Sequence, residues 1–444
     1  MPTARIAAAS LLLCATVIPV AGCSSGGGAP TMRAAPPEAA GFSPDGLAAL
    51  AALLDRYLER GAFPGGVIAV GTPGGPVHLH PFGRLSHDQD APAVAADTIY
   101  DLASLTKVAA TTAMAMILFD EGRLDLDRPV QSFLPGFTGA GKDEVTVRHL
   151  LTHSAGIEGH LPLYLEIRGK EAYVERIQRL DLVYEPGTKS VYSDLGIILL
   201  GEILERIAGE PLDAFVRRRV FEPLGMDDTT FRPGPELLPR IAPTEDDAWR
   251  GRVVRGEVHD ENAAAMGGVA PHAGLFGTAG DLARFARMIL RGGTVEGRRI
   301  VSPATIDLFT RRAGVPGSDR ALGWDTKSAE GSSAGELFSP GSYGHLGFTG
   351  TSLWIDPERG LFVVLLTNRV HPTRDNTLIR EARPAVHDAV IRALIRDDRE
   401  GAESPPQGVT GCSRGQIQLA PTPAANVTAE PASANHGQAS GVAK

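Results

Sequence analysis

The chain has 444 residues, 43% of them hydrophobic, which is enough for one large domain or two ordinary ones. Its formal net charge is -9 at pH 7, and no cluster of basic residues interrupts that balance. A nucleic-acid-binding surface is therefore not expected.

The N-terminus carries the pattern of an export signal. Residues 1–22 contain Arg5 and then a short run of apolar and small residues, too short to span a bilayer. Small residues stand directly before Cys23, and a Ser/Gly-rich tether follows. This pattern resembles a bacterial lipobox, which implies a signal peptide over 1–22, cleavage before Cys23 and lipidation of its thiol. The alternative is an ordinary signal peptide that happens to contain a cysteine.

The cysteine count follows from that assignment. Cys14 leaves with the signal peptide and Cys23 is lipidated, so only Cys412 stays free. No internal disulfide and no zinc site built from cysteines is then expected. We predict an exported, lipid-anchored protein that faces the periplasm. Ser24, which is not acidic, favours the outer membrane if the cell has one.

The first elements of the folded part read as a helix and a hairpin. Residues 23–40 are rich in Gly, Ala, Pro and Ser and predict a flexible, lipid-anchored linker. Ser43 and Pro44 are a typical helix start, and leucines at helical spacing continue to Gly61. Residues 65–70 and 77–82 then predict two strands joined by a turn.

The remainder predicts helices followed by more strands. Between 123 and about 280 the chain is mostly helix and loop, with clear helices over 194–208 and, just beyond, 281–292. Strands are expected over 350–356 and 361–368. They are followed by a last helix over about 376–395 and a disordered tail over 399–444.

These elements predict an α+β fold. Strands occur at both ends and helices between them, so the economical arrangement is one antiparallel sheet built from both termini. A mostly helical subdomain, about 105–280, is inserted into a single domain of residues 41–398. A catalytic cleft is expected between the two parts.

Ser104 and Lys107 form an S-x-x-K motif. They lie three residues apart at the start of an apolar run that predicts a buried helix ending at Gly122. Burial penalises the lysine ammonium and lowers its pKa, so Lys107 is expected to act as a base on Ser104. The alternative is a helix cap at Ser104 beside a surface lysine.

Two later segments offer partners for this pair. Tyr192 opens the helix over 194–208, and next to a cationic lysine its pKa is expected to fall so that it can shuttle protons. Residues 341–350 are glycine-rich and contain His345, where a strand edge could offer a backbone N–H to an oxyanion. A core tyrosine and an ordinary glycine-rich turn are the alternatives.

In this order, S-x-x-K at 104, Y-x-D at 192 and H-x-G at 345, the motifs resemble the serine β-lactamase and penicillin-binding protein superfamily, on its class C and D,D-peptidase side. The similarity covers about 42–395. It implies the β-lactamase/transpeptidase-like fold and an acyl-enzyme on a serine, with no metal and no cofactor.

Position by position, the resemblance implies that Ser104 is the nucleophile, Lys107 its base and Tyr192 a proton relay. His345 stands where many relatives have lysine. The backbone N–H groups of Ser104 and Phe348 would form the oxyanion hole.

Two departures weaken the expectation of efficient β-lactam hydrolysis. Asp194 replaces a common asparagine, and an ionised aspartate cannot donate to a substrate carbonyl. Leu346 replaces a hydroxyl residue that could contact a substrate carboxylate.

A closer similarity lies in residues 258–276, 347–354 and 366–372, which resemble a sub-branch containing muramoyl-L-alanine amidases. It implies peptidoglycan-derived or β-lactam-like small substrates. The substrate-binding residues expected from these segments are Asp194, Gly347, His259, Glu261 and Asn262.

Two other patterns are not assigned a ligand. His259, Asp260 and Glu261 look like metal ligands, but adjacent residues rarely converge on one ion, so a polar loop lining the cleft is preferred. Residues 136–143 nearly spell a phosphate-binding loop. Asp143 stands where that motif has its Ser or Thr, and no strand precedes the segment, so no such loop is predicted.

The sequence therefore predicts a monomeric serine hydrolase that cleaves cell-wall amides, with the muramoyl-L-alanine bond preferred. An esterase, a D,D-peptidase or a weak β-lactamase of the same fold is the first alternative. A cell-wall sensor or binding protein without turnover is the second.

Overall fold

The computed structural model describes residues 36–395. The predicted signal peptide, Cys23, nearly all of the linker and the tail over 399–444 lie outside the described residues. Within the described range, no helix combines the length and the apolar character that crossing a membrane requires.

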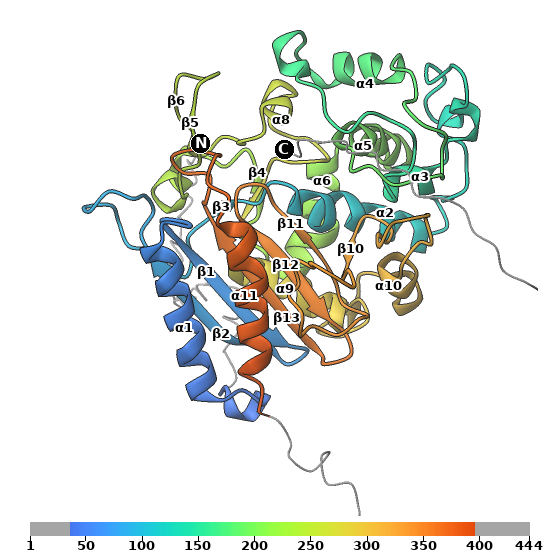
Figure 1. The fold of residues 1–444 in the computed structure, drawn as a ribbon. Coiled ribbons are helices and arrows are strands. Elements are labelled where there is room, and N and C mark those ends of the chain that lie inside the picture. The colour runs from blue at the N-terminus through green and yellow to red at the C-terminus, as the bar shows by residue number, and fades with distance from the viewer. Residues whose placement is uncertain (1–35, 396–444) are drawn as a thin grey trace, which may run out of the picture. The chain divides into compact units, whose positions relative to one another are not determined.

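The centre of the fold is a six-stranded antiparallel sheet in the order β10-β11-β12-β13-β1-β2 (Figure 1). Strand β1 pairs with β13, so the N-terminal hairpin joins the C-terminal strands side by side. This confirms the predicted sheet built from both ends of the domain. The strands are β1 (Gly65–Thr72), β2 (Gly75–Gly83), β10 (Asp325–Thr326), β11 (Tyr343–Leu346), β12 (Ser352–Asp356) and β13 (Leu361–Thr367).

Apolar residues of the sheet pack alternately into two hydrophobic cores, one on each face. In β13, Val363 and Leu365 pack toward α1 (Pro44–Glu59) and α11 (Ile379–Arg392). Val364 and Leu366 face the opposite core, which contains α9 (Ala279–Leu290) and the helical subdomain. Because side chains of a strand alternate between faces, one continuous apolar strand serves both layers. Figure 1 shows α1 and α11 together on one face of the sheet.

The helical subdomain contains the predicted helix α5. Three unpredicted strands of two or three residues form a second, small sheet. Its order is β3-β7-β4. Strands this short carry too few residues for a visible alternation, so periodicity could not reveal them. The other elements are α2 (Ala113–Asp120), α3 (Val147–Leu151), α4 (Lys170–Gln178), α5 (Asp194–Ala208), α6 (Leu212–Val216), α7 (Glu222–Leu224), α8 (Glu261–Ala265), α10 (Pro303–Thr310), β3 (Tyr100–Asp101), β4 (Thr230–Phe231), β5 (Asp246–Asp247), β6 (Arg252–Val253), β7 (Leu275–Gly277), β8 (Thr294–Val295) and β9 (Arg298–Arg299).

The segment at Ser104 differs in detail from the expected α-helix. Ser104 lies in a tight turn after β3, and the chain continues as a π-helix over Lys107–Thr112 before α2 begins. Ala103, directly before Ser104, has a φ of 46°, in the left-handed region that non-glycine residues rarely adopt. Strained backbone and π-turns both concentrate at functional sites.

Candidate active site

Two side chains converge on the hydroxyl of Ser104. Lys107 Nζ donates to Ser104 Oγ at 2.9 Å, and the hydroxyl of Tyr192 donates to the same oxygen, also at 2.9 Å. Lys107 comes from the π-helix and Tyr192 from the residues just before α5, so the fold joins two segments 88 residues apart. The structure brings together the serine, lysine and tyrosine of the predicted motifs.

Lys107 is a charged lysine held by three acceptors. Its ammonium lies against Ser104 Oγ, the carbonyl oxygen of His272 at 2.8 Å and Asp194 Oδ1 at 2.8 Å. Burial alone lowers the pKa of Lys107, but the attraction of Asp194 and Tyr192 outweighs it, so the pKa is raised. The expectation of a lysine whose pKa falls on burial is wrong, because it left out the carboxylate at the start of α5.

Tyr192 is held by aromatic and cationic neighbours. Its ring lies 4.7 Å from the ring of His153, and the guanidinium of Arg320 lies 5.0 Å from its centre. Burial raises the pKa of Tyr192, Lys107 lowers it and Asp194 raises it, with a net rise. The predicted fall is therefore also wrong. In this state Tyr192 is a neutral donor to Ser104.

His345 lies on β11, buried behind Tyr192, with ring centres 6.0 Å apart. Its Nδ1 lies 2.8 Å from the carbonyl oxygen of Leu346, and its Nε2 has no hydrogen-bond partner within residues 36–395. Burial lowers the pKa of His345 to about 4, so the ring is neutral at pH 7. It does not supply the positive charge of the lysine that it replaces.

The turn that carries Phe348 packs directly onto the Ser104 segment. Thr349 Oγ1 donates to the carbonyl of Asp101 at 2.7 Å, and Thr351 Oγ1 donates to that of Leu102 at 3.0 Å. A Cβ atom on Gly347 would lie only 2.6 Å from the Leu102 oxygen, so this position requires glycine. The two predicted oxyanion donors, the N–H groups of Ser104 and Phe348, thus belong to segments locked together.

Asp101 is a site residue that the sequence reasoning missed. Its carboxylate accepts hydrogen bonds from the backbone N–H groups of Ala103 at 2.8 Å and His259 at 2.6 Å. It therefore holds the strained residue before Ser104 and ties it to a loop 158 residues away. An aspartate two residues before the strained position was the only local signal, because short polar side chains cap such turns.

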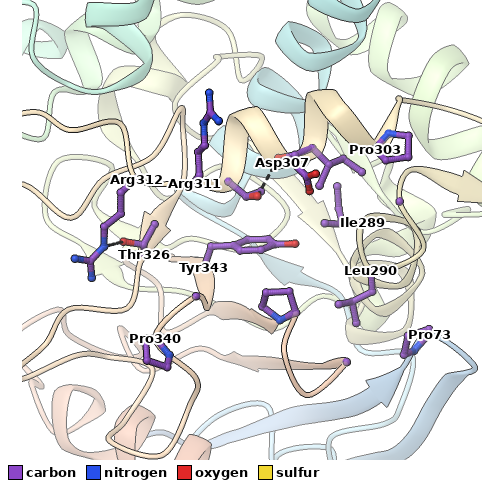
Figure 2. Close-up of a pocket in the computed structure, with 16 residues that line it drawn as sticks. Pro73, Ile289, Leu290, Pro303, Asp307, Arg311, Arg312, Thr326, Pro340 and Tyr343 are labelled. Carbon is purple, nitrogen blue, oxygen red and sulfur yellow. Dashed lines mark hydrogen bonds between the residues drawn. The ribbon is translucent and has the colours of Figure 1, made fainter. Parts of the chain in front are cut away.

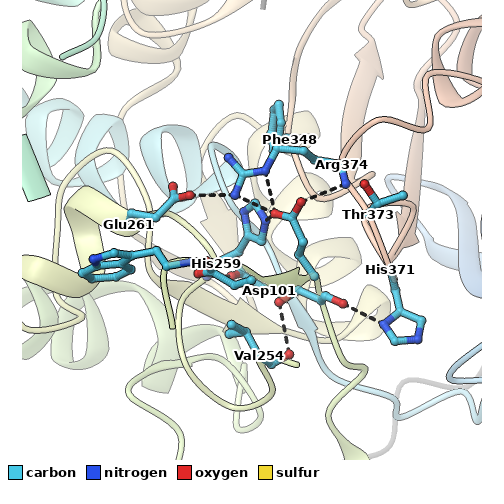
Figure 3. A network of polar contacts seen from close by, with 12 residues as sticks. Asp101, Val254, His259, Glu261, Phe348, His371, Thr373 and Arg374 are labelled. Atoms are coloured by element: carbon cyan, nitrogen blue, oxygen red, sulfur yellow. Dashed lines mark hydrogen bonds and ion pairs between the residues drawn. The ribbon is translucent and has the colours of Figure 1, made fainter. Parts of the chain in front are cut away.

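His259 and Glu261 belong to a polar network beside Phe348, shown in Figure 3. His259 Nε2 lies 2.8 Å from Glu245, and Arg374 bridges Glu245 and Glu261 at 2.6 Å each. The imidazole of His259 also stacks on the ring of Phe348, with centres 5.7 Å apart. The network thus contacts the ring of Phe348 through His259 and Arg374.

Asn262 is the remaining predicted substrate-binding residue. Asn262 is buried, and its side-chain oxygen accepts from the N–H of Tyr164 and the hydroxyl of Tyr173, while its amide donates to Leu161. These contacts tie α8 to the segment that contains Leu161, Tyr164 and Tyr173. Among the described residues, no three metal-ligating side chains are brought together as an ion site.

A cavity of about 660 Å³ lies elsewhere, between α10, the end of α9 and Tyr343 (Figure 2). None of Ser104, Lys107 and Tyr192 lines it. This cavity is therefore separate from the hydrogen-bonded cluster at Ser104.

Comparisons with known proteins agree with this geometry. The sequence profile of the family described as "Beta-lactamase" matches residues 50–387. A protein of Bacillus subtilis (strain 168) named "N-acetylmuramyl-L-alanine amidase" is 32% identical over 371 residues, which cover 75% of this chain and 83% of that protein. A protein of Escherichia coli (strain K12) named "Putative D-alanyl-D-alanine carboxypeptidase" is 34% identical and covers 62% of this chain and 70% of its own length.

Among solved structures, "EstCE1, a hydrolase with promiscuous acyltransferase activity" superimposes with a TM-score of 0.62 at 26% identity. The match covers 77% of this chain and 99% of that structure. The family profile spans most of the described domain, and the antiparallel sheet, the helical subdomain and the Ser104 cluster accord with it. The chain therefore belongs to the beta-lactamase family and is a serine hydrolase.

Proposed function

We propose that Ser104 is the nucleophile of an amidase that acts on muropeptides through an acyl-enzyme. The observation that carries the proposal is the convergence of Lys107 Nζ and the Tyr192 hydroxyl on Ser104 Oγ at 2.9 Å. Such a pair can take the proton of a serine and return it to a leaving group.

The proton count defines the reactive state. Lys107 is an ammonium and Tyr192 is neutral in the structure, so both donate to Ser104 and neither is a base. The pair must first release one proton, and its two groups then titrate together. In that state it accepts the Ser104 proton as Oγ bonds to the substrate carbonyl carbon.

The remaining steps reuse the same groups. The N–H groups of Ser104 and Phe348 stabilise the oxyanion, and Tyr192 returns the proton to the leaving nitrogen as the C–N bond breaks. Water then attacks the acyl-enzyme, giving up its proton to the pair, which restores Ser104 and releases the acid.

The muramoyl-L-alanine amide is the proposed scissile bond. The amidase relative from Bacillus subtilis supports it, because the similarity extends over 83% of that protein. The pairing of Asp194 with Lys107 argues against efficient β-lactam hydrolysis, since this side chain donates nothing to a substrate. His259, Glu261 and Gly347 are proposed to line the substrate cleft around Phe348.

The test is a mass-spectrometric digest of purified muropeptides by the full chain in detergent, beside Ser104→Ala. Release of the intact peptide from the sugar by the wild type alone is expected. Loss of a terminal D-alanine instead would contradict the amidase and indicate a D,D-peptidase, the activity named for the relative from Escherichia coli. Binding of muropeptides with no product and no labelling of Ser104 would indicate a binding protein.

We further propose that the protein is exported and anchored through a lipid on Cys23, as a monomer. Metabolic labelling with a radioactive fatty acid should mark the wild type and not Cys23→Ser. Fractionation of the cell envelope then identifies the membrane that holds the protein. Light scattering of the detergent-solubilised protein measures its oligomeric state.

A further inference from the structure

A buried arginine lies beneath the turn that carries Phe348. Arg383, on α11, has 7% of its surface exposed. Its Nη2 donates to the carbonyl oxygen of Gly347 at 2.6 Å and to that of Thr351 at 2.8 Å. These two carbonyls stand at the two ends of the turn, so one guanidinium holds it from behind.

The contact with Gly347 has a specific electronic consequence. The C=O of Gly347 and the N–H of Phe348 belong to one planar peptide group, in which the carbonyl and the N–H share electrons by resonance. A charged donor on the oxygen draws electron density toward it, which makes the N–H of the same group a stronger donor. Arg383 therefore acts on one of the two N–H groups proposed to bind the oxyanion.

A neighbouring arginine provides a contrast. Arg369 Nε donates to the carbonyl oxygen of Phe348 at 2.9 Å. That carbonyl belongs to the next peptide group, whose N–H is on Thr349. Arg369 thus supports the turn without acting on the N–H of Phe348, and Arg383 alone of the two is placed for that effect.

The charge of Arg383 is unusual because no carboxylate forms an ion pair with it within residues 36–395. Burial lowers its pKa to about 9, with Arg369 adding to the effect, so it is still a cation at pH 7. Burying an unpaired cation is unfavourable, and a neutral side chain could also hold a turn. The fold nevertheless keeps this positive charge next to the carbonyl oxygen of Gly347, in the same peptide group as the N–H of Phe348.

We propose that Arg383 is a positioning residue that polarises the N–H of Phe348 through the carbonyl of Gly347 and so strengthens the oxyanion hole. This inference rests on the proposed function of Ser104 as a nucleophile. Arg383 itself touches neither substrate nor Ser104.

The experiment compares Arg383→Gln, Arg383→Lys and a matched control, Arg380→Gln, which removes one exposed charge from the same helix. Each full-length variant is titrated with phenylboronic acid, whose adduct on Ser104 is tetrahedral and anionic, and is labelled with an aryl phosphonate. Loss of a whole oxyanion donor lowers reaction rates by roughly a hundredfold or more. Weakening one donor should therefore lower the labelling rate by about tenfold. Thermal unfolding midpoints establish that each variant is folded.

We expect Arg383→Gln to bind the boronate about tenfold more weakly and to be labelled about tenfold more slowly. Arg383→Lys should restore both within about threefold, since it keeps a charge at the carbonyl. Arg380→Gln should match the wild type. A folded Arg383→Gln that behaves like Arg380→Gln would overturn the inference, as would an Arg383→Lys impaired by more than about tenfold.

Two outcomes separate this inference from the proposed function. If the phosphonate does not label Ser104 in the wild type, the proposed nucleophile fails. If the wild type is labelled but the Arg383 variants are labelled equally fast, only the role of Arg383 fails. Should Arg383→Gln not fold, Arg383→Lys decides alone, since boronate binding weakened by more than about tenfold in that variant would overturn the inference.

Discussion

Asp194 Oδ1 lies 2.8 Å from Lys107 Nζ and keeps this buried lysine protonated beside Ser104. The carboxylate is at the first residue of α5, whose N-cap is Ser193. Its charge raises the pKa of Lys107 and that of Tyr192 as well. In the proposed mechanism the pair must lose a proton before it can accept that of Ser104, so Asp194 is expected to raise the pH at which activity appears.

The first prediction concerns that pH. In Asp194→Asn the negative charge is gone, so the pKa of the Lys107–Tyr192 pair should fall and the rise of kcat/KM with pH should move to lower pH. The profile is measured with any substrate that is turned over, beside Asp55→Asn, an exposed change on α1. A profile of Asp194→Asn that coincides with the wild type, or moves to higher pH, would contradict this role.

The same substitution has an effect on stability with a defined sign. Because the folded-state pKa of Lys107 is raised, its charged form stabilises the fold below its ordinary pKa of 10.5, and this contribution is lost as pH rises through the folded value. At pH 7, Asp194→Asn should therefore lower the free energy of unfolding. The loss should stay under about 3 kcal/mol, since Lys107 keeps two other acceptors. Urea unfolding at pH 7 measures it.

Ser104→Ala should abolish turnover and covalent labelling while leaving the fold intact. Removal of a serine nucleophile typically lowers kcat by about 10⁴-fold or more. The methyl group fits the space of the hydroxymethyl group, so the thermal midpoint should stay near that of the wild type. Intact-mass spectrometry after phosphonate treatment reads the labelling. The Ser86→Ala control keeps Ser104 and should show the same mass shift as the wild type. A mass shift in Ser104→Ala would place the nucleophile elsewhere.

Tyr192→Phe should separate catalysis from packing. The variant keeps the ring that lies 4.7 Å from His153 but loses the hydroxyl that contacts Ser104 Oγ. Loss of a proton relay lowers kcat by roughly 10²- to 10⁴-fold, and KM should change little. Tyr57→Phe is the control, because its hydroxyl contacts Glu381 on the other face of the sheet. An unchanged kcat in Tyr192→Phe would leave proton transfer to Lys107 alone.

The sequence was sufficient for the elements that carry long periodic patterns. The helix after Ser43, the strands that pair as β12 and β13, and the helix after Tyr192 all lie close to their expected places. The first two motifs also predicted which side chains would meet at Ser104, whereas His345 of the third motif lies next to Tyr192. Local patterns and ordered motifs were enough for both.

What the sequence could not reveal depends on contacts between distant segments. The raised pKa of Lys107 follows from Asp194, which no local rule places beside it. The roles of Asp101 and Arg383 arise from hydrogen bonds to His259 and Gly347, which lie 158 and 36 residues away. A buried side chain bound to a backbone N–H or carbonyl group leaves no pattern in the chain, because nearly every residue offers both groups.

The last prediction concerns the network beside Phe348. Burial alone raises the pKa of Glu245, but hydrogen bonds from His259 and Arg374 outweigh it and lower that pKa to about 2. Ionised Glu245 thus stabilises the fold above its ordinary pKa of 4.5, and this contribution is lost as pH falls toward 2. Glu245→Gln should lower the free energy of unfolding at pH 7, by about 3 kcal/mol at most.

The pH dependence identifies the cause of that loss. The difference in unfolding free energy between the wild type and Glu245→Gln should shrink steadily from pH 5 to pH 3. Over this range the carboxyl of Glu245 takes up a proton in the unfolded chain, while the folded protein keeps it ionised down to about pH 2. Glu59→Gln, an exposed change on α1, should show no such trend. A difference that stays constant over this range would mean that the glutamine disturbs packing and that the charge of Glu245 contributes nothing to holding the turn of Phe348.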